Sequence, residues 1–306
     1  MRLALIGQQA FGKAALDAFR ERGDIVAGVF VAPEKPGAKP DPLHARALEL
    51  GITVHQFQRY TSPEAQSALQ GLNVDIGVMA YVTQFVPQSF VKIPKHGTIQ
   101  FHPSLLPAHR GPSSINWPIM QGKRETGLSI FRPVDGLDEG PVILQKRIPI
   151  GPDDTLGSIY FDRIFPMGVA ALAEAADLVV SGRAVEHMQD ESAASYEGWV
   201  REAESRIAWS QHLDVIYNLI RGCNPQPGAW CMLGERRLQI FDARKITAQT
   251  FGSVKGLKLG EVGPVSGEGF RVHAQGGFVE VLRCRIDNGP KVAGKDAGIA
   301  AGAVLT

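Results

Sequence analysis

The sequence of 306 residues is poor in cysteine and has almost no excess of charge of either sign. Its three cysteines, Cys223, Cys231 and Cys284, are an odd number without CxxC spacing, which argues against a disulfide framework and against a structural zinc site. The net charge of +1 provides no overall field that would favour nucleic acid or a membrane surface. We therefore expect a cytoplasmic protein that binds no metal.

A long apolar run is also absent. No stretch approaches the roughly 18 residues needed to cross a bilayer, so we expect no membrane partner. The start of the chain, MRLALIGQQAFG, lacks a small-residue cleavage site, which favours a first strand over a signal peptide. Apolar residues at 44% and charged residues at 21% are typical of soluble globular proteins, and the length predicts two domains.

Residues 1–182 alternate short apolar runs with helical stretches, and we expect them to form the first domain. The runs LALIG (3–7) and IVAGVFV (25–31) are continuous and rich in β-branched residues, as strands buried on both faces should be. The apolar spacing between them predicts a helix over 12–22. The alternation continues with a helix over 42–50 and strands over 52–57, 74–80 and 97–102. This pattern predicts an α/β fold, a doubly wound, mostly parallel sheet with helices on both faces.

The style of the sequence then changes. Residues 127–150 contain two alternating runs around a Gly/Asp-rich turn, which predicts an antiparallel excursion at the end of the sheet. A long helix is expected over roughly 155–180, and a polar linker over 183–207. Residues 208–306 begin with a helix over 211–221 and continue as short strands broken by glycines. We expect this second domain to be a small β-barrel of OB-like type or a sandwich.

The loop GQQAFGK (7–13) nearly matches the phosphate-binding pattern G-x-x-x-x-G-K-[ST], but Ala14 stands where the Mg²⁺-binding hydroxyl belongs. Nucleotide hydrolysis is thereby disfavoured, and the absence of G-x-G-x-x-G leaves a nicotinamide dinucleotide site without support. A tight strand-to-helix turn explains Gly7 and Gly12 without any ligand. Backbone N–H groups at a helix start can nevertheless face an anionic co-substrate.

The segment HPSLLPAHRG (102–111) directly follows a predicted buried strand. His102 is therefore expected at the carboxyl end of that strand, where ligands bind in open α/β sheets. Two prolines and a glycine are typical of an ordered loop, so a functional role for His102 is favoured over a purely structural one. His109 is less favoured, because we expect it on the exposed part of the loop beside Arg110.

The segment VDGLDEG (134–140) places Asp135 and Asp138 in a glycine-framed turn. Aspartate is common in turns for backbone reasons alone, so a structural role is the default for each. If this turn meets the end of the His102 strand, one of the two can orient and charge the imidazole. A His–Asp pair without a Ser or Cys nucleophile suits proton transfer and oxyanion stabilisation rather than covalent catalysis.

HPSLLPAHRG followed by DGLDEG resembles the paired signature of the folate-dependent formyltransferases. The resemblance covers nearly the whole chain, including IGQQAFG at the start and IRGCNPQPGAW (220–230) before the predicted strands of the second domain. Within the family the likeness leans toward the N-terminal hydrolase domain of 10-formyltetrahydrofolate dehydrogenase. The resemblance implies 10-formyltetrahydrofolate as the substrate, with no metal and no nicotinamide.

The resemblance also implies site residues. His102 would be the catalytic histidine and Asp138 its partner, while Gln100 occupies the place of the family's usual Asn. The pterin would lie in an apolar slot between the segment 79–86 and the turn 134–138. In the first segment its walls and polar contacts would come from Gln84, Phe85 and Val86. In the second they would come from Val134, Asp135 and Gly136. Ser104 would line the acceptor side or cap its own loop.

The formyl acceptor stays open between water and an amine such as methionyl-tRNA or an amino sugar. The longer side chain of Gln100 favours water. Transfer to tRNA is less favoured, because the loop holding Glu34, Lys35, Lys39 and Asp41 is short and mixed in charge, and residues from 207 onward carry 12 basic against 8 acidic side chains. A folate-binding sensor without activity is a third reading, opposed by the presence of both His102 and Asp138. The sequence makes no prediction of the oligomeric state.

Overall fold

The computed structural model describes residues 1–35 and 37–306. The chain divides into two compact units. Unit 1 comprises residues 1–111, 127–147 and 163–196, and unit 2 comprises residues 112–126, 148–162 and 197–306. The expected linker is thus shared, since its residues up to Tyr196 belong to unit 1 and the rest to unit 2.

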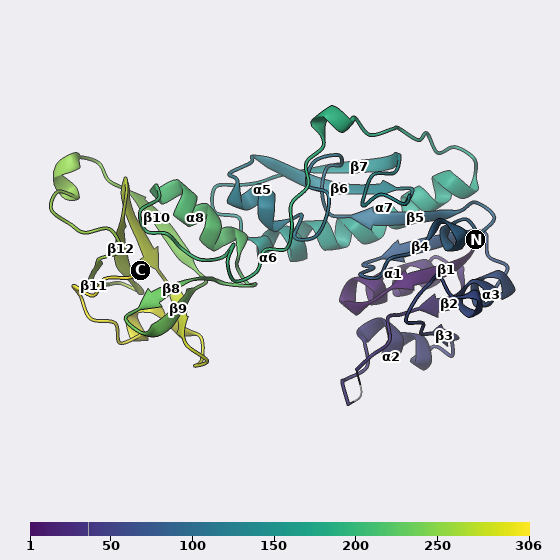
Figure 1. Cartoon of the computed structure of the whole chain (residues 1–306), viewed down its shortest axis with the longest axis horizontal. Helices are drawn as coiled ribbons and strands as arrows, with labels where there is room; N and C mark the ends of the chain where they lie inside the picture. The colour runs from purple at the N-terminus through teal and green to yellow at the C-terminus, as the bar shows by residue number, and fades with distance from the viewer. Residues whose placement is uncertain (36) are drawn as a thin grey trace. The chain divides into compact units, whose positions relative to one another are not determined.

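A seven-stranded sheet forms the centre of unit 1 (Figure 1). Its strands lie in the order β3 (Val54–His55), β2 (Ile25–Phe30), β1 (Arg2–Gly7), β4 (Ile76–Ala80), β5 (Thr98–His102), β6 (Glu125–Phe131) and β7 (Val142–Pro149). The five strands from β3 to β5 pair in parallel, and β6 is antiparallel to β5. This arrangement confirms the predicted mostly parallel sheet with an antiparallel excursion. The strand order reverses between β1 and β4, and ligands bind in such sheets beyond the carboxyl ends of the strands at this reversal.

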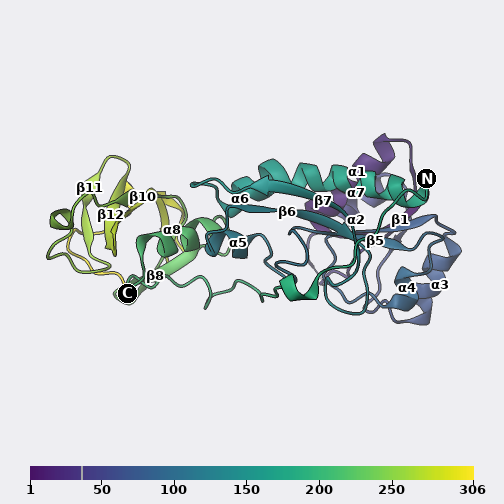
Figure 2. The ribbon, with the colours of Figure 1, turned by 90° about the horizontal axis from the view of Figure 1, so that it is seen from above.

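Helices cover both faces of the sheet (Figure 2). On one face α1 (Gln9–Glu21) contacts both α2 (Pro42–Glu49) and α7 (Phe165–Val180), and α7 lies on β4 and β5. On the other face α3 (Pro63–Gly71) contacts α4 (Gln88–Val91). The strands are almost fully buried between these layers, which explains their continuous apolar sequences.

The long helix expected over 155–180 is three consecutive helices. It begins with α6 (Leu156–Ile159), continues as a π-helical turn η1 (Tyr160–Ile164) and ends with α7. Pro166, in the first turn of α7, has no N–H with which to continue the α-helical hydrogen-bond ladder from the preceding residues. The π turn lies where that ladder is interrupted.

Unit 2 is built on two four-stranded antiparallel sheets and one longer helix, α8 (Leu213–Gly222), which contacts β10 and β13 (Figure 1). One sheet has the order β10 (Ala243–Thr247), β13 (Gly277–Val281), β12 (Gly269–Ala274) and β11 (Val262–Ser266). The other has the order β15 (Val292–Ala293), β14 (Arg283–Ile286), β9 (Arg236–Ile240) and β8 (Ala229–Leu233). Besides α6, the short helices of unit 2 are α5 (Asn116–Met120), η3 (Phe251–Ser253) and η4 (Gly294–Asp296), and η2 (Glu191–Ala193) lies in unit 1. The all-β character is as predicted, whereas the OB-like assignment stays a prediction.

The three cysteines lie in unit 2 as free, fully buried thiols. Burial raises the pKa of Cys223 and Cys231 to about 12 and that of Cys284 to about 11. Thiols with such pKa values are poor nucleophiles at neutral pH and pack as small apolar groups. Across residues 1–35 and 37–306, no helix is both long and apolar enough to cross a membrane.

Candidate functional site

His102 is the last residue of β5 and lies at the carboxyl edge of the sheet, as expected from its position in the sequence. Its Nε2 lies 2.9 Å from the carbonyl oxygen of His109. Because a carbonyl only accepts, Nε2 carries a proton, and Nδ1 is the ring nitrogen that can gain or lose one. The loop 102–111 thus fixes both the ring orientation and the nitrogen that is available for chemistry.

The carboxylate of Asp138 lies on the Nδ1 side of this imidazole. Its Oδ2 is 3.5 Å from His102 Nδ1, and the two side chains are only 7% and 6% exposed. The same oxygen accepts a hydrogen bond from the backbone N–H of Gly111 at 2.9 Å. The turn between β6 and β7 therefore reaches the end of β5, and a buried acid–imidazole pair results. Such a pair can hold an imidazolium and exchange a proton with a bound reactant.

Gln100 lies two residues before His102 on β5 and pairs with Met79 of β4 and Phe131 of β6. Residues two apart on a strand point to the same face, so Gln100 and His102 share one face of the sheet. Gln100 is half-buried. Donation from its side-chain amide to an oxyanion beside His102 stays a prediction.

Ser104 has a structural task in its own loop. The residue is fully buried, and its hydroxyl donates to the carbonyl oxygen of Ala108 at 2.7 Å. Its own carbonyl accepts from the hydroxyl of Ser129 on β6 at 2.7 Å. These contacts favour the loop-capping alternative over contact with an acceptor.

The predicted pterin slot consists of two segments that lie side by side. Gln88 Nε2, just after the first segment, donates at 3.0 Å to the carbonyl oxygen of Pro133, just before the second. Phe85 and Val134 are 63% and 37% exposed, and Tyr81 and Leu137 are also exposed large apolar side chains. Exposed apolar side chains in two adjoining loops are suited to enclosing a flat heterocycle.

The other predicted slot residues differ in burial and in their hydrogen bonds. Val86 is 7% exposed and packs in the core under α3 and α4, so it is not an open wall of the slot. Gln84 donates from Nε2 to the carbonyl oxygens of Phe57 and Gln58, at 3.0 and 3.2 Å. Asp135 is exposed and Gly136 half-buried in the turn. Contact of these residues with a folate stays a prediction.

The loop between β1 and α1 is shaped by close packing. A Cβ on Gly7 would lie 2.1 Å from the carbonyl oxygen of Ala80, and one on Gly12 would lie 2.9 Å from Leu43 Cδ2. The backbone N–H of Gln9, at the start of α1, donates to both carboxylate oxygens of Asp41, at 2.9 and 2.8 Å. A carboxylate of the chain itself therefore takes the position where the sequence allows an anionic co-substrate.

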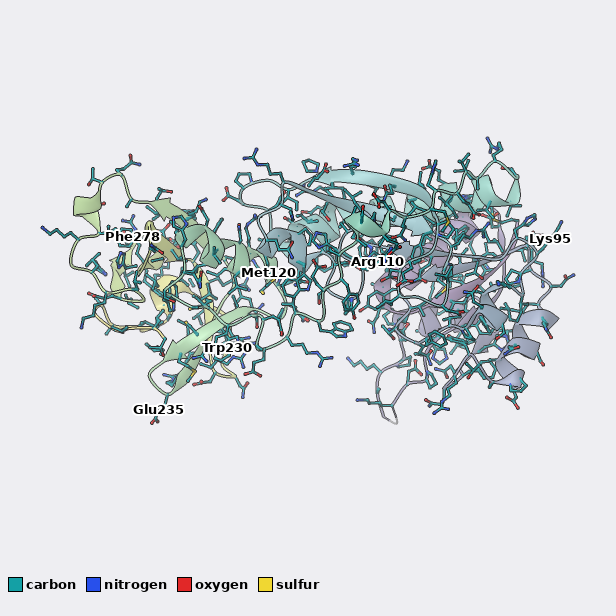
Figure 3. The ribbon with its side chains drawn as sticks, turned by 45° about the horizontal axis from the view of Figure 1, so that its top comes forward. Lys95, Arg110, Met120, Trp230, Glu235 and Phe278 are labelled. Atoms are coloured by element: carbon teal, nitrogen blue, oxygen red, sulfur yellow. The ribbon has the colours of Figure 1, made fainter. Side chains whose placement is uncertain are left out.

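Several residues around the site are missed by the sequence reasoning. His109, expected on an exposed loop, is buried at 8% exposure, and its backbone N–H donates to Ser195 Oγ at 2.8 Å. Gln189 and Glu191, in the expected linker, bind the buried guanidinium of Arg110, which is labelled in Figure 3. The polar sequence of the linker has no periodicity that would reveal these contacts, because each depends on a partner distant in the sequence.

Charge pairing holds this group together. The hydrogen bond from Arg110 to Glu191 raises the pKa of the guanidinium and lowers the pKa of the carboxylate below its ordinary 4.5. The shortest contact, between Arg110 Nη2 and Glu191 Oε1, is 2.6 Å. Arg110 is 5% exposed, so this charge is largely removed from water and depends on its partners.

Two protein-family models match the chain. Residues 1–175 match the model described as formyl transferase, and residues 200–299 match the model of the formyl transferase C-terminal domain.

Two of the curated relatives differ in how much of their length the chain covers. The chain is 38% identical over 253 residues to the mitochondrial 10-formyltetrahydrofolate dehydrogenase of Mus musculus and covers 27% of that protein's length with 81% of its own. It is 32% identical over 315 residues to the methionyl-tRNA formyltransferase of Geotalea uraniireducens, covering 98% of that protein with 100% of its own. The chain thus spans little more than a quarter of the first relative and nearly all of the second.

Two solved structures share the fold over most of the chain. HypX from Aquifex aeolicus in complex with tetrahydrofolic acid has a TM-score of 0.68 at 18% identity, over 96% of this chain and 46% of that one. WlaRD, a sugar 3N-formyl transferase, has a TM-score of 0.68 at 17% identity, over 95% of this chain and 99% of that one. At these identities the likeness shows the fold alone.

Proposed function

The chain belongs to the folate-dependent formyltransferase family, and on this premise we propose that it hydrolyses 10-formyltetrahydrofolate to tetrahydrofolate and formate. The family is the one that the motifs predict. The observation that carries the proposal is the buried pair of His102 and Asp138, with 3.5 Å between Nδ1 and Oδ2. The exposed apolar side chains of the segment 79–86 and the turn 134–138 would take the pterin.

In the proposed reaction water attacks the formyl carbon, and a C–O bond forms while the C=O electrons move to the formyl oxygen. Asp138 accepts the proton that the attacking water loses. The His102 imidazolium, with the Gln100 amide, donates to the developing oxyanion. The C–N10 bond then breaks, N10 takes up the proton returned through Asp138, and formic acid leaves and ionises to formate by giving its proton to water. No electrons are gained or lost overall.

Two features support water as the acceptor. Asp41 places a negative charge at the start of α1, so a phosphate-bearing acceptor would meet a carboxylate there. Gln100 differs from the family's usual Asn by one methylene, which extends the amide further over the face of β5. We expect both features to act on the choice of acceptor.

A second candidate is formyl transfer to an amine. Its support is the full-length similarity to a methionyl-tRNA formyltransferase, compared with the quarter-length overlap with the dehydrogenases. The acceptor amine would replace water, and Asp138 would take the proton from its nitrogen. The two candidates share the donor, and only the products separate them.

The experiment is turnover of 10-formyltetrahydrofolate, with formate and tetrahydrofolate measured with and without methionyl-tRNA or an amino sugar. Hydrolysis predicts equal amounts of both products in the absence of any amine, whereas tetrahydrofolate release that requires an amine supports the second candidate. His102→Ala and Asp138→Asn are each expected to lower kcat by about 100-fold or more. Asp177→Asn, on the exposed side of α7, is the control. Near-normal turnover in either site variant overturns the assignment.

A further inference from the structure

The side chain of Gln189 makes four hydrogen bonds to two segments of the site. Its Nε2 donates to the carbonyl oxygens of Asp138 and Gly140, at 2.7 Å each. Its Oε1 accepts from Nε and Nη2 of Arg110, at 3.2 and 2.9 Å. Because carbonyls only accept and guanidinium only donates, this arrangement fixes which end of the amide faces which segment.

The turn that carries Asp138 needs such an anchor. Asp138 has a φ of 57°, a left-handed conformation that is uncommon for residues other than glycine, although aspartate adopts it more readily than most. Its neighbour Leu137 is 52% exposed, so little apolar packing holds the turn. Gly140 is held closely, since a Cβ there would meet the carbonyl oxygen of Arg132. The bonds from Gln189 thus hold the carbonyl group of Asp138 itself and that of Gly140, two residues further along the turn.

Arg110 extends the anchor to the other half of the site. It belongs to the loop 102–111, whose His109 carbonyl orients His102 and whose Gly111 N–H binds Asp138 Oδ2. Gln189 therefore connects the loop 102–111, which orients His102, to the turn that carries Asp138. A displacement of either by about 1 Å can cost on the order of 100-fold in rate, because a proton-transfer pair is sensitive to its separation.

We propose that Gln189 is a positioning residue that fixes the backbone of Asp138 relative to His102 and thereby sets the rate of formyl release. The inference rests on the proposed function for its effect on turnover, but the anchoring of the turn can be measured without it. Gln189 is half-buried and polar, so its removal takes little apolar surface from the core.

Two substitutions distinguish the hydrogen bonds of Gln189 to the turn from those to Arg110. Gln189→Met keeps the length and removes all four hydrogen bonds, whereas Gln189→Glu keeps an acceptor for Arg110 and loses both donors to the turn. Both variants are expected to lower kcat by about ten- to 100-fold while the Kd for tetrahydrofolate changes less than about twofold. Met188→Gln, at a neighbouring residue that is 79% exposed, is the matched control and keeps wild-type kcat.

A double-mutant cycle distinguishes positioning of Asp138 from a general loss of stability. Once Asp138→Asn has removed the carboxylate, adding Gln189→Met is expected to lower kcat no further. Wild-type kcat in Gln189→Glu, or a full additional loss in the double variant, overturns the positioning role.

Hydrogen exchange of the backbone amides in 134–140 tests the same anchor independently of turnover. Faster exchange in Gln189→Met than in wild type and Met188→Gln is expected, with exchange in β1 and β4 unchanged. Unchanged exchange in the turn contradicts the inference. If wild type itself leaves 10-formyltetrahydrofolate intact, the proposed function fails, while the exchange result still decides whether Gln189 holds the turn.

Discussion

The carboxylate of Asp41 binds the backbone N–H of Gln9 with both of its oxygens, at 2.9 and 2.8 Å, across a sequence separation of 32 residues. Its Oδ1 also accepts from the backbone N–H of Leu43 at 2.9 Å, so Asp41 is the N-cap of α2. One side chain therefore stabilises the starts of two helices. The negative charge lies at the positive end of both helix dipoles.

Asp41→Ala is expected to lower the free energy of unfolding by about 0.5–2 kcal/mol, the range for loss of an N-cap. Urea unfolding followed by far-UV circular dichroism measures the change. Asp41→Asn is the control, because asparagine caps helices about as well as aspartate. Equal stability of Asp41→Ala and wild type, or equal losses in both variants, would show that the capping is unimportant.

Much of the fold can be predicted from local sequence, and the exceptions have physical causes. The buried strands β1, β2, β4 and β5 appear where continuous apolar runs occur, since strands covered on both faces need no alternation. The helix α1 begins at Gln9 rather than at Gly12, because Asp41 supplies from outside the segment the cap that the local sequence lacks. Contacts between distant residues decide the elements' ends, and no local pattern records them.

Gly7→Ala is expected to destabilise unit 1 by about 1–3 kcal/mol, because the new Cβ would lie 2.1 Å from the carbonyl oxygen of Ala80. The backbone of β4 cannot move away without disturbing its pairing with β1. Gly71→Ala at the end of α3 is the control, since nothing lies within 4 Å of its Cβ position, and a change within about 0.5 kcal/mol is expected. Urea midpoints compare the two, and a Gly7→Ala protein as stable as Gly71→Ala would refute the close-packing explanation.

Glu191→Gln is expected to have a pH-dependent effect on stability. The hydrogen bond from Arg110 lowers the pKa of Glu191 below 4.5, so its stabilisation is fully present above that ordinary value and is lost as the pH falls through the lower value in the folded protein. The difference in unfolding midpoint between wild type and Glu191→Gln should therefore be constant at neutral pH and shrink toward zero below about pH 4. A difference that stays the same down to about pH 3.5 would exclude the ion pair as its source.

The candidate site is predictable where a residue's place along the chain already determines its place in the sheet. His102 ends a buried strand, so its position at the carboxyl edge follows from topology alone. Asp138 can be singled out from the sequence only through the motif DGLDEG. Its left-handed backbone and its contact with Gly111 depend on the folded turn. Gln189 can be predicted neither from strand position nor from a motif. In an aperiodic polar segment, the sequence does not distinguish a residue exposed to water from one that binds the backbone of the Asp138 turn.

Gln100 tests how the amide on β5 contributes to the chemistry. Gln100→Leu removes the amide at similar volume and is expected to lower kcat by about 100- to 1000-fold, the range for one oxyanion donor. Gln100→Asn keeps the donor but withdraws it by one methylene, so a smaller loss of about ten- to 100-fold is expected. Tetrahydrofolate binding should be unchanged in both, because the amide acts on the transition state.

The same variants bear on the acceptor. If the longer side chain of Gln100 favours water as the formyl acceptor, Gln100→Asn is expected to transfer more formyl groups to an added amine. The ratio of formylated amine to formate then rises above that of wild type. Gln70→Leu, at an exposed position of α3, controls for the loss of an amide elsewhere and keeps both the rate and the ratio of wild type. Wild-type turnover in Gln100→Leu would show that the amide takes no part in stabilising the oxyanion. An unchanged product ratio in Gln100→Asn would assign the choice of acceptor to other residues.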